Sequence, residues 1–434
     1  MKRRIILAAA ALIVSALCVG LWYVRGMAPL DMGDTQMDAG ADFVTAYGQL
    51  DADDTLKIEQ TFYLTNRTGA ALEEIVLRLY ANGNKPSAVK SLEASVNGDL
   101  VDAQIDEDDA TLITIARPWA QDEAIDLTLW TEIRLDMSKD IAVVALPVLA
   151  PIWDGQWQTE LFDPLAGTLY APAMDGELDV RYPNGWKAVF ANGTRGMTLA
   201  VSKNACVRWR EIGGVAVSAM ADNVFAANRL LDCAKTAIES LEAIGLAYPF
   251  ASLSIADAQP VSADGDVYSG LIVLESEGKK EELIQRMTRL IAAQTFGVLV
   301  GNDAWNTPWL SRSLPSAVEL IAYRQRKGQA AFAARYEEEI EVASRVTRPY
   351  GVTVGADIRH FGGDAEMTQV LRDQGGAMLL GIEQAIGEEV FMAALRMYIE
   401  ENAGSFADRA ALERALKAAS GSSWEGYLTD ELAY

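Results

Sequence analysis

The spacing of apolar residues changes near residue 222, and this change limits the folds open to the chain. Before it, short runs alternate between apolar and polar residues, as in strands with one buried face. The clearest runs are 57–64, 72–80, 111–116 and 124–134, and Asn-Gly pairs that favour turns lie at 97–98, 184–185 and 192–193. The sequence therefore predicts an antiparallel β domain of one or two sheets over 57–222.

After residue 222 a helical spacing dominates. Residues 223–243 carry apolar side chains near one helical face, and Gly245 ends that segment. The apolar runs 253–256 and 271–274 are typical of short strands. We expect further helices at 279–299, 315–326, 329–345, 364–384, 388–400 and 408–419. The predicted fold class is α+β, with a mostly helical domain over 223–434.

The N-terminus combines a basic start with a long apolar stretch. Three basic residues follow Met1, and residues 5–24 are all apolar or small. About 20 such residues cross a bilayer, and basic residues on the near side favour a cytoplasmic N-terminus. We expect 1–26 to be a single-pass cell-membrane anchor, with the bulk of the chain extracytoplasmic. A signal peptide whose cleavage releases a secreted protein is the alternative. The polar segment 27–56 is expected to be a juxtamembrane linker.

The charge beyond this segment is strongly negative. Residues 1–25 hold four of the 37 Lys and Arg residues and no Asp or Glu, so the rest has 33 basic and 61 acidic residues, a formal −28. Such a charge argues against nucleic acid as a partner. The plain interpretation is a soluble acidic ectodomain.

Histidine and cysteine are scarce, and this restricts the chemistry. His360 is the one histidine, so a zinc site with two His ligands cannot form. Its surroundings show no nucleophile or ligand spacing, which favours a structural or surface role. Cys206 and Cys233 could pair outside the cell or remain two buried free thiols, and the sequence leaves this open.

Several short stretches occur in the order found in one family of zinc peptidases. They are 62–68 followed by 72–82, 245–250, 268–272, Phe296-Gly297, Pro308-Trp309-Leu310, Tyr323 and 386–391. Over about 57–434 the chain resembles the gluzincin aminopeptidases, whose best-known member is membrane alanyl aminopeptidase. The resemblance implies a saddle-like β domain, a thermolysin-like helical domain, and a metal-binding helix pair within 284–323.

The family binds zinc through two His at positions i and i+4 of one helix and a Glu 19 residues after the second. Alignment on Phe296-Gly297 places Arg289, Ala293 and Arg312 at these positions. The Trp309-Leu310 stretch gives the same 19-residue spacing independently. By the same resemblance, the general base falls on Leu290, the substrate-strand Glu on Val267, and the transition-state Tyr on Asp373.

None of these side chains can perform the family's chemistry. An Arg keeps its proton and repels a metal, and Leu or Ala offers no donor atom. We therefore expect a degenerate member of the family, with no catalytic residue, no metal ligand and no cofactor. Two buried Arg need partners. Asp373, Asp364 or Glu319 could pair with them inside the protein, or an anion such as a peptide carboxylate could bind between them.

The sequence thus predicts a pseudopeptidase whose former groove binds a peptide or protein. Candidate groove or anion-binding residues are Arg289, Arg312, Asp373, Tyr268, Gly270 and Trp309. The aromatic residues of these family-like stretches, Trp309 included, can also be explained simply as core residues. One alternative is an active zinc aminopeptidase with an atypical site. A second is a structural envelope protein with a collapsed groove.

Overall fold

The structure, a computed structural model, describes residues 42–83, 88–137, 140–153, 155–163, 167, 169–341 and 352–433. Gly40–Tyr434 packs as one compact unit. In the described part of the chain, no helix is both long and apolar enough to cross a membrane. The predicted anchor or signal segment, 1–26, lies outside the described residues.

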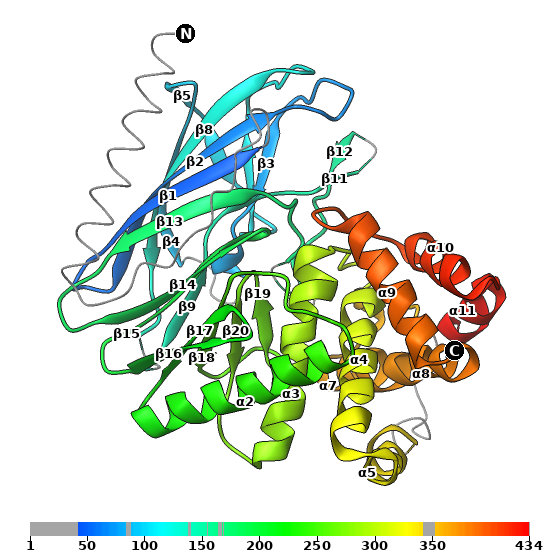
Figure 1. The fold of residues 1–434 in the computed structure, drawn as a ribbon. Coiled ribbons are helices and arrows are strands. Elements are labelled where there is room, and N and C mark those ends of the chain that lie inside the picture. Colours follow the sequence, from blue (N-terminus) through cyan, green and yellow to red (C-terminus); the bar gives the residue numbers. More distant parts are fainter. Residues whose placement is uncertain are drawn as a thin grey trace. The chain divides into compact units, whose positions relative to one another are not determined.

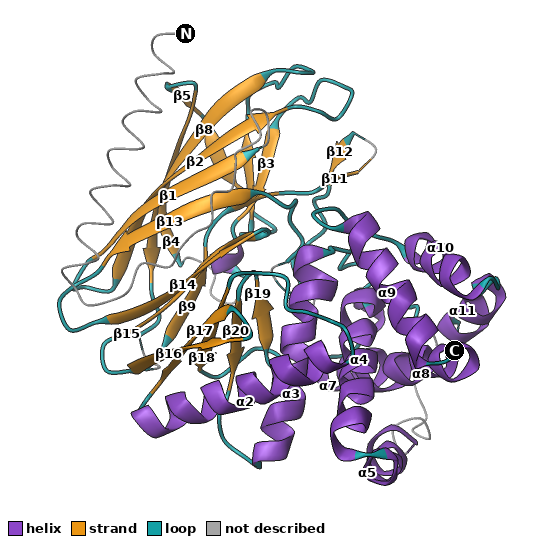
Figure 2. Ribbon diagram, in the orientation of Figure 1, coloured by secondary structure: helices purple, strands orange, loops and turns teal. Residues whose placement is uncertain are grey.

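The N-terminal half is built from β-sheets (Figures 1 and 2). The largest has six strands in the order β13-β1-β2-β8-β4-β5, antiparallel except for the parallel pair β1–β13. A four-stranded sheet has the order β10-β3-β7-β6, and β11 pairs with β12. The bounds are β1 Phe43–Leu50, β2 Thr55–Thr65, β3 Ile75–Arg78, β4 Val89–Val96, β5 Asp99–Val101, β6 Ala103–Ile105, β7 Leu112–Ile115, β8 Ala124–Arg134, β10 Val148–Leu149, β11 Ile152–Trp153, β12 Gln156–Trp157 and β13 Asp175–Arg181.

Strand alternation explains these sheets. In β2 every second residue, from Leu56 to Leu64, is buried, while its neighbours face solvent. The buried faces of the six- and four-stranded sheets supply a shared apolar core that includes Phe62, Ile75 and Leu127. Antiparallel sheets with one buried face and one solvent-exposed face produce this period-two pattern. The predicted β-rich architecture is therefore correct for this half, apart from the parallel pair.

The predicted linker over 27–56 is wrong in its second half. Residues 43–50 form β1, and Val44, Ala46 and Leu50 are buried in the core. The strand was not predicted because its alternating run is only eight residues long and lies in an acidic, polar segment. The part of the predicted linker before residue 42 lies outside the described residues.

A second group of strands joins the two halves of the chain. One sheet has the order β14-β15-β9, and another has the order β16-β17-β18-β20-β19. Strand β17 runs parallel to β18, and helix α2 (Val224–Ala243) connects them as a crossover. The bounds are β9 Ala142–Ala145, β14 Lys187–Gly193, β15 Gly196–Ser202, β16 Cys206–Ile212, β17 Val215–Ala221, β18 Ser252–Asp257, β19 Asp266–Tyr268 and β20 Leu271–Leu274.

This five-stranded sheet corrects the predicted boundary at 222. Strands β16 and β17 precede that residue, yet they pair into one sheet with β18, β20 and β19. The change from strand to helix at α2 is real, but it marks a crossover within a sheet, because a parallel pair needs such a connection. The β-rich segment 57–222 and the helical segment 223–434 therefore share a structural layer.

The C-terminal half is mostly helical, and its helices gather on one side of the sheets (Figure 2). The α-helices are α2, α3 Lys280–Ala293, α4 Trp309–Lys327, α5 Gln329–Arg335, α7 Asp364–Met367, α8 Gly375–Ile386, α9 Glu388–Asn402, α10 Arg409–Ser420 and α11 Glu425–Leu432. The π-helical segments are η3 Gln294–Leu299, η4 Tyr336–Glu341 and η6 Thr368–Gln374, and the 3-10 turns are η1 Tyr80–Asn82 and η5 Ile358–His360.

Helix positions agree with the sequence better than helix ends do. The predicted helix 279–299 divides into α3 and π-helical η3. Helix α4 begins at Trp309 instead of 315, directly after Pro308, a residue suited to the start of a helix. Helix α11 was not predicted, because eight residues give too short a periodic signal.

The aromatic residues singled out around the helix pair 284–323 lie in the core or pack against it. Trp309 and Phe296 are each 2% exposed, Trp305 is buried, and Tyr323 packs against this core from its edge. This agrees with the core explanation of the Trp-containing stretch and places α3 and α4 side by side. The pairing of these two helices fixes the geometry of the site described next.

Candidate functional site

A cavity of about 410 Å³ opens where the β-rich half meets α3, α4 and α7. Its wall includes strand β19 and the loop that leads into it, residues 258–265. Seven of the site residues singled out from the sequence line this cavity: Val267, Tyr268, Arg289, Leu290, Ala293, Arg312 and Asp364. A volume of this size is in the range of ligand pockets in proteins.

Helical periodicity explains why these side chains meet. Arg289 and Ala293 are four residues apart on α3, so they face the same side of that helix. Arg312 lies in the first turn of α4, which packs beside α3. Ala293 and Arg312, which are 19 positions apart in the sequence, thus lie on one wall. The three positions that the resemblance aligns with metal ligands therefore line one cavity.

Arg289 is paired inside the protein. Its Nε and Nη2 donate to the two carboxylate oxygens of Asp264 at 2.8 and 2.5 Å, and its Nη1 contacts Glu319 Oε2 at 3.3 Å. The Arg289 side chain is 10% exposed and that of Glu319 is 2% exposed. Such a fork-to-carboxylate contact is a strong charge-assisted arrangement. Of the partners expected from the sequence, Glu319 is the one that pairs with Arg289.

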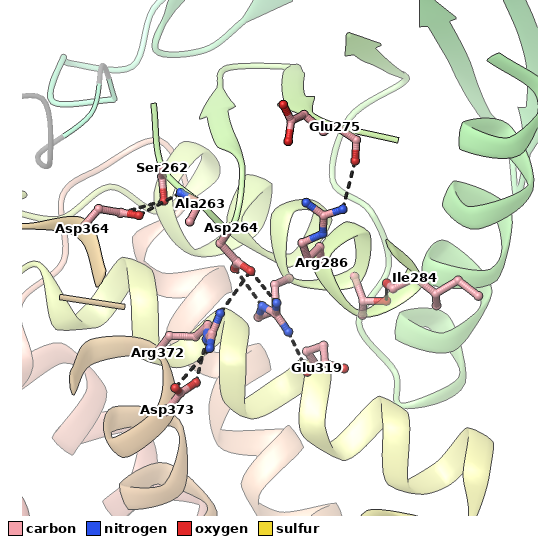
Figure 3. Close-up of polar contacts among 12 residues, drawn as sticks. Ser262, Ala263, Asp264, Glu275, Ile284, Arg286, Glu319, Asp364, Arg372 and Asp373 are labelled. Carbon is pink, nitrogen blue, oxygen red and sulfur yellow. Dashed lines mark hydrogen bonds and ion pairs between the residues drawn. The ribbon is translucent and has the colours of Figure 1, made fainter. Parts of the chain in front are cut away.

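Two more arginines extend this contact into a network, with Asp264 at its centre (Figure 3). Arg372 Nη1 lies 3.3 Å from Asp264 Oδ1, and Arg372 Nε donates to Asp373 Oδ1 at 2.6 Å. Arg335 donates to both oxygens of Glu319, at 2.8 and 3.0 Å. Three guanidinium groups therefore meet three carboxylates, and the network is neutral.

The network sets the protonation state of its members. Burial alone raises the pKa of Asp264, but the Arg289 and Arg372 charges outweigh burial and hold that pKa below its usual range. Burial opposes the charge of Arg289, yet Asp264 and Glu319 raise the pKa of Arg289 above its ordinary value. Asp264 and Arg289 are therefore both charged near neutral pH, and Arg289 cannot become a proton donor or a metal ligand.

Arg312 lies in a different electrostatic setting on the same wall. It is half-buried, and burial lowers its pKa, while Asp364, Asp264 and Asp266 act in the opposite direction. Asp364 accepts hydrogen bonds from Ser262 Oγ at 2.9 Å and from the Ala263 N–H at 2.8 Å, which fixes the loop before β19. Arg312 is thus a cavity-lining cation in an acidic neighbourhood.

The edge strand β19 is held by a buried amide. Gln294, fully buried in η3, accepts from the Gly270 N–H at 2.9 Å and donates to the Tyr268 carbonyl at 2.9 Å. Gly270 has φ +76°, a conformation that favours glycine. The side-chain amide therefore satisfies main-chain groups at the end of this strand. Gly270 does not line the cavity, in contrast to Tyr268 and Val267.

The other candidate groove residues also lie off the cavity wall. Trp309 is in the core, and Asp373 is buried beside Arg372. His360 lies elsewhere, with a half-exposed ring whose Nδ1 is 3.2 Å from Asp357. Cys206 and Cys233 are free thiols, the second buried in α2.

Sequence reasoning missed Asp264, Gln294, Arg335 and Arg372. Asp264 is 25 residues from Arg289 and 108 from Arg372, so no local spacing connects them. A usable signal was the burial expected for Arg289, because a buried guanidinium requires a carboxylate partner. Asp264 was available for that role, two residues before the strand already aligned with the substrate strand.

The side chains present do not fit a zinc ion. A zinc site needs three protein donors such as His, Cys, Asp or Glu within about 2.3 Å of the metal. Arg289 and Arg312 are cations, and Ala293 has no donor atom. Among the residues that the structure describes, no group of three or more His, Cys, Asp and Glu side chains could hold a metal. No chemical step through zinc follows from this site.

The fold is that of the M1 zinc metallopeptidases. The M1 zinc metallopeptidase from Deinococcus radiodurans and a point mutant of it each give a TM-score of 0.60 at 15% identity, over 91% of this chain and 94% of theirs. A two-domain M1 zinc metallopeptidase mutant bound to L-arginine gives a TM-score of 0.61 at 15% identity, over 92% and 94%. No family model matches the sequence, and no curated protein is similar to it. The likeness therefore concerns the fold.

Proposed function

We propose that this protein is a membrane-anchored, extracytoplasmic pseudopeptidase that binds a peptide or a protein segment in the cavity beside Arg289. The proposal depends on one observation. The cavity is open, while the positions aligned with metal ligands hold Arg289, Ala293 and Arg312. An open site whose ligand positions carry no donor for a metal can bind a ligand but lacks the zinc-bound water of the family.

The lining suits a peptide better than a free anion. Arg289 is neutralised by Asp264 and Glu319, so it does not attract an added carboxylate. Leu290, Ala293 and Val267 supply apolar surface. Apolar walls with a few polar groups are typical of sites that bind organic ligands. The expected occupant is a peptide segment with an uncharged side chain directed at α3.

Two alternatives are less favoured. A structural protein with a collapsed groove would have filled this space, and a cavity of about 410 Å³ argues against it. An active zinc aminopeptidase would need a base and ligands, and Leu290 cannot accept a proton. The N-terminal segment 5–24 supports the membrane anchor by its length and composition alone.

Selection of peptides on the full-length protein tests the proposal. Random seven-residue peptides displayed on phage are selected on wild type in detergent and then measured for affinity to Ala293→Trp. A Trp at the cavity wall should displace the ligand and weaken binding at least tenfold, since the added side chain projects into the space that the ligand would occupy. Arg208→Met, which changes an exposed residue on β16, is the matched control and should bind as wild type does.

Equal affinity of wild type and Ala293→Trp would show that the cavity is not the binding site. Val267→Trp, on the facing strand, repeats the test in case the first variant unfolds. Release of a free amino acid from the selected peptides, abolished by a chelator, would support the active-enzyme alternative instead.

A further inference from the structure

The outward face of the six-stranded sheet carries an unusual combination of side chains. The inward residues of these strands, such as Ala46, Ile58 and Leu129, lie in the core, so their neighbours in sequence point to solvent. Several of these outward neighbours are aromatic. Tyr47 is 49% exposed and Tyr63 is 43% exposed. Isolated exposed aromatics are ordinary, but here they lie on one face.

The strand register arranges these side chains in a row across five strands. Tyr47 lies opposite Asp179 on β13 and opposite Glu59 on β2. Trp130 lies opposite Glu59 on β2 and opposite Glu93 on β4. The row therefore alternates between carboxylate and ring. Trp130 Nε1 donates to Glu59 Oε2 at 3.0 Å, which fixes the indole against its neighbour.

This row crosses a hollow of about 550 Å³ formed by β13, β1, β2, β8 and β4. Its lining includes all five members of the row. Carboxylates outnumber cations on the outward face, with Glu59, Glu93, Asp126, Glu132, Asp175, Glu177 and Asp179 against Lys57, Arg134 and Arg181. Lys57 is already paired with Asp51 at 3.0 Å. The hollow is thus aromatic and net negative.

We propose that this face binds a basic, extended segment of a partner protein. Lys or Arg side chains of the partner would lie over Tyr47 and Trp130, between the flanking carboxylates. A cation over an exposed aromatic ring is attracted to the negative face of that ring, and an adjacent carboxylate adds to this attraction. The negative field would also increase the rate of association.

Charge decides between this occupant and others. Nucleic acid and anionic membranes would be repelled by the same carboxylates. A neutral glycan can stack on Tyr and Trp, but it would cover several carboxylates without neutralising them, which is unfavourable. A basic protein segment can both stack on the aromatic rings and neutralise the carboxylates. This surface is separate from the cavity, so the two binding proposals can fail independently.

The test measures binding of fluorescein-labelled decalysine to the full-length protein in detergent at low salt. Glu93→Gln with Asp179→Asn should weaken binding roughly tenfold, and Tyr47→Thr should weaken it several-fold. Tyr47→Phe keeps the ring and should bind as wild type does. Glu337→Gln with Glu338→Gln removes the same charge from exposed positions on η4 and should change affinity less than about twofold.

The same loss of affinity in both charge-changed pairs would mean that the overall negative charge attracts decalysine, and the proposal would be wrong. Binding of cellohexaose, with decalysine unbound, would assign the face to a neutral glycan instead. Because the substituted side chains are exposed, the variants should keep the unfolding midpoint of wild type, and this is measured alongside.

Discussion

At the scale of single residues, the main result is the fate of Arg289. A guanidinium occupies a position where the resemblance implied a metal ligand, and Asp264 and Glu319 neutralise it. An isolated charge at a buried site costs several kcal/mol, so the substitution is tolerable only with these partners. The network therefore connects α3 to the loop before β19 and to α4 through charged contacts.

Removing one partner should be costly. We expect Asp264→Asn to lower the free energy of unfolding by about 3–5 kcal/mol, because it leaves Arg289 and Arg372 short of a counter-charge in a buried site. Urea unfolding at pH 7 measures this. Glu239→Gln, which breaks the exposed pair with Lys235, should cost less than about 1 kcal/mol. A similar small loss for Asp264→Asn would show that the network contributes little.

The network also predicts a pH dependence. The pKa of Asp264 is lowered in the folded state, so its stabilising contribution is complete above the unfolded pKa of about 3.9 and is lost progressively below it. The difference in free energy of unfolding between wild type and Asp264→Asn should therefore shrink as the pH falls from 6 to 3. A difference that stays constant over this range would contradict the assigned ion pair.

At the scale of elements, the sequence predicts periodic segments well and contacts between them poorly. The resemblance, with its 19-residue spacing from Ala293 to Arg312, implied that both positions face one cavity, and both line it. Asp264 could not be predicted, because its contacts depend on how a loop packs against α3 and η6. The sequence also does not predict the π-helical segments η3 and η6, which position Gln294 and Asp373.

Arg195 shows how a single side chain joins separate elements. It lies in the turn between β14 and β15 and donates to three carbonyls, those of Val298 in η3, Ala171 and Ser405, at 2.6–2.7 Å. Its guanidinium also lies 4.5 Å from the Phe406 ring centre. Burial lowers the pKa of Arg195 to about 10, so it remains charged near neutral pH.

We expect Arg195→Met to lower the free energy of unfolding by at least about 2–3 kcal/mol, because the buried contacts to the Val298 and Ala171 carbonyls and the part-buried contact to the Ser405 carbonyl lose a charged donor. Thermal and urea unfolding of the variant measure the effect. Arg208→Met, at an exposed position of β16, should change stability by less than about 0.5 kcal/mol. Equal stability of the two variants would show that the contacts of Arg195 do not stabilise the packing of the two halves.

At the scale of the whole molecule, a fold resembling that of the M1 peptidases is combined with a site whose aligned metal-ligand positions, Arg289, Ala293 and Arg312, carry no donor for a metal. The same general architecture can serve binding after its chemistry is lost, because packed elements and not the site supply the stability. The M1 fold, the cavity and the internal network are consistent with one account. In it, ion pairs between α3, α4 and the loop before β19 occupy the place of a metal.

Zinc content tests this account most directly. The full-length protein, purified without chelator and dialysed against zinc, is measured for bound metal by mass spectrometry, with a known M1 zinc metallopeptidase treated in parallel. We predict far less than one zinc per chain, because Arg289, Ala293 and Arg312 cannot coordinate it. About one zinc per chain, removed by a chelator together with peptide hydrolysis, would contradict the account.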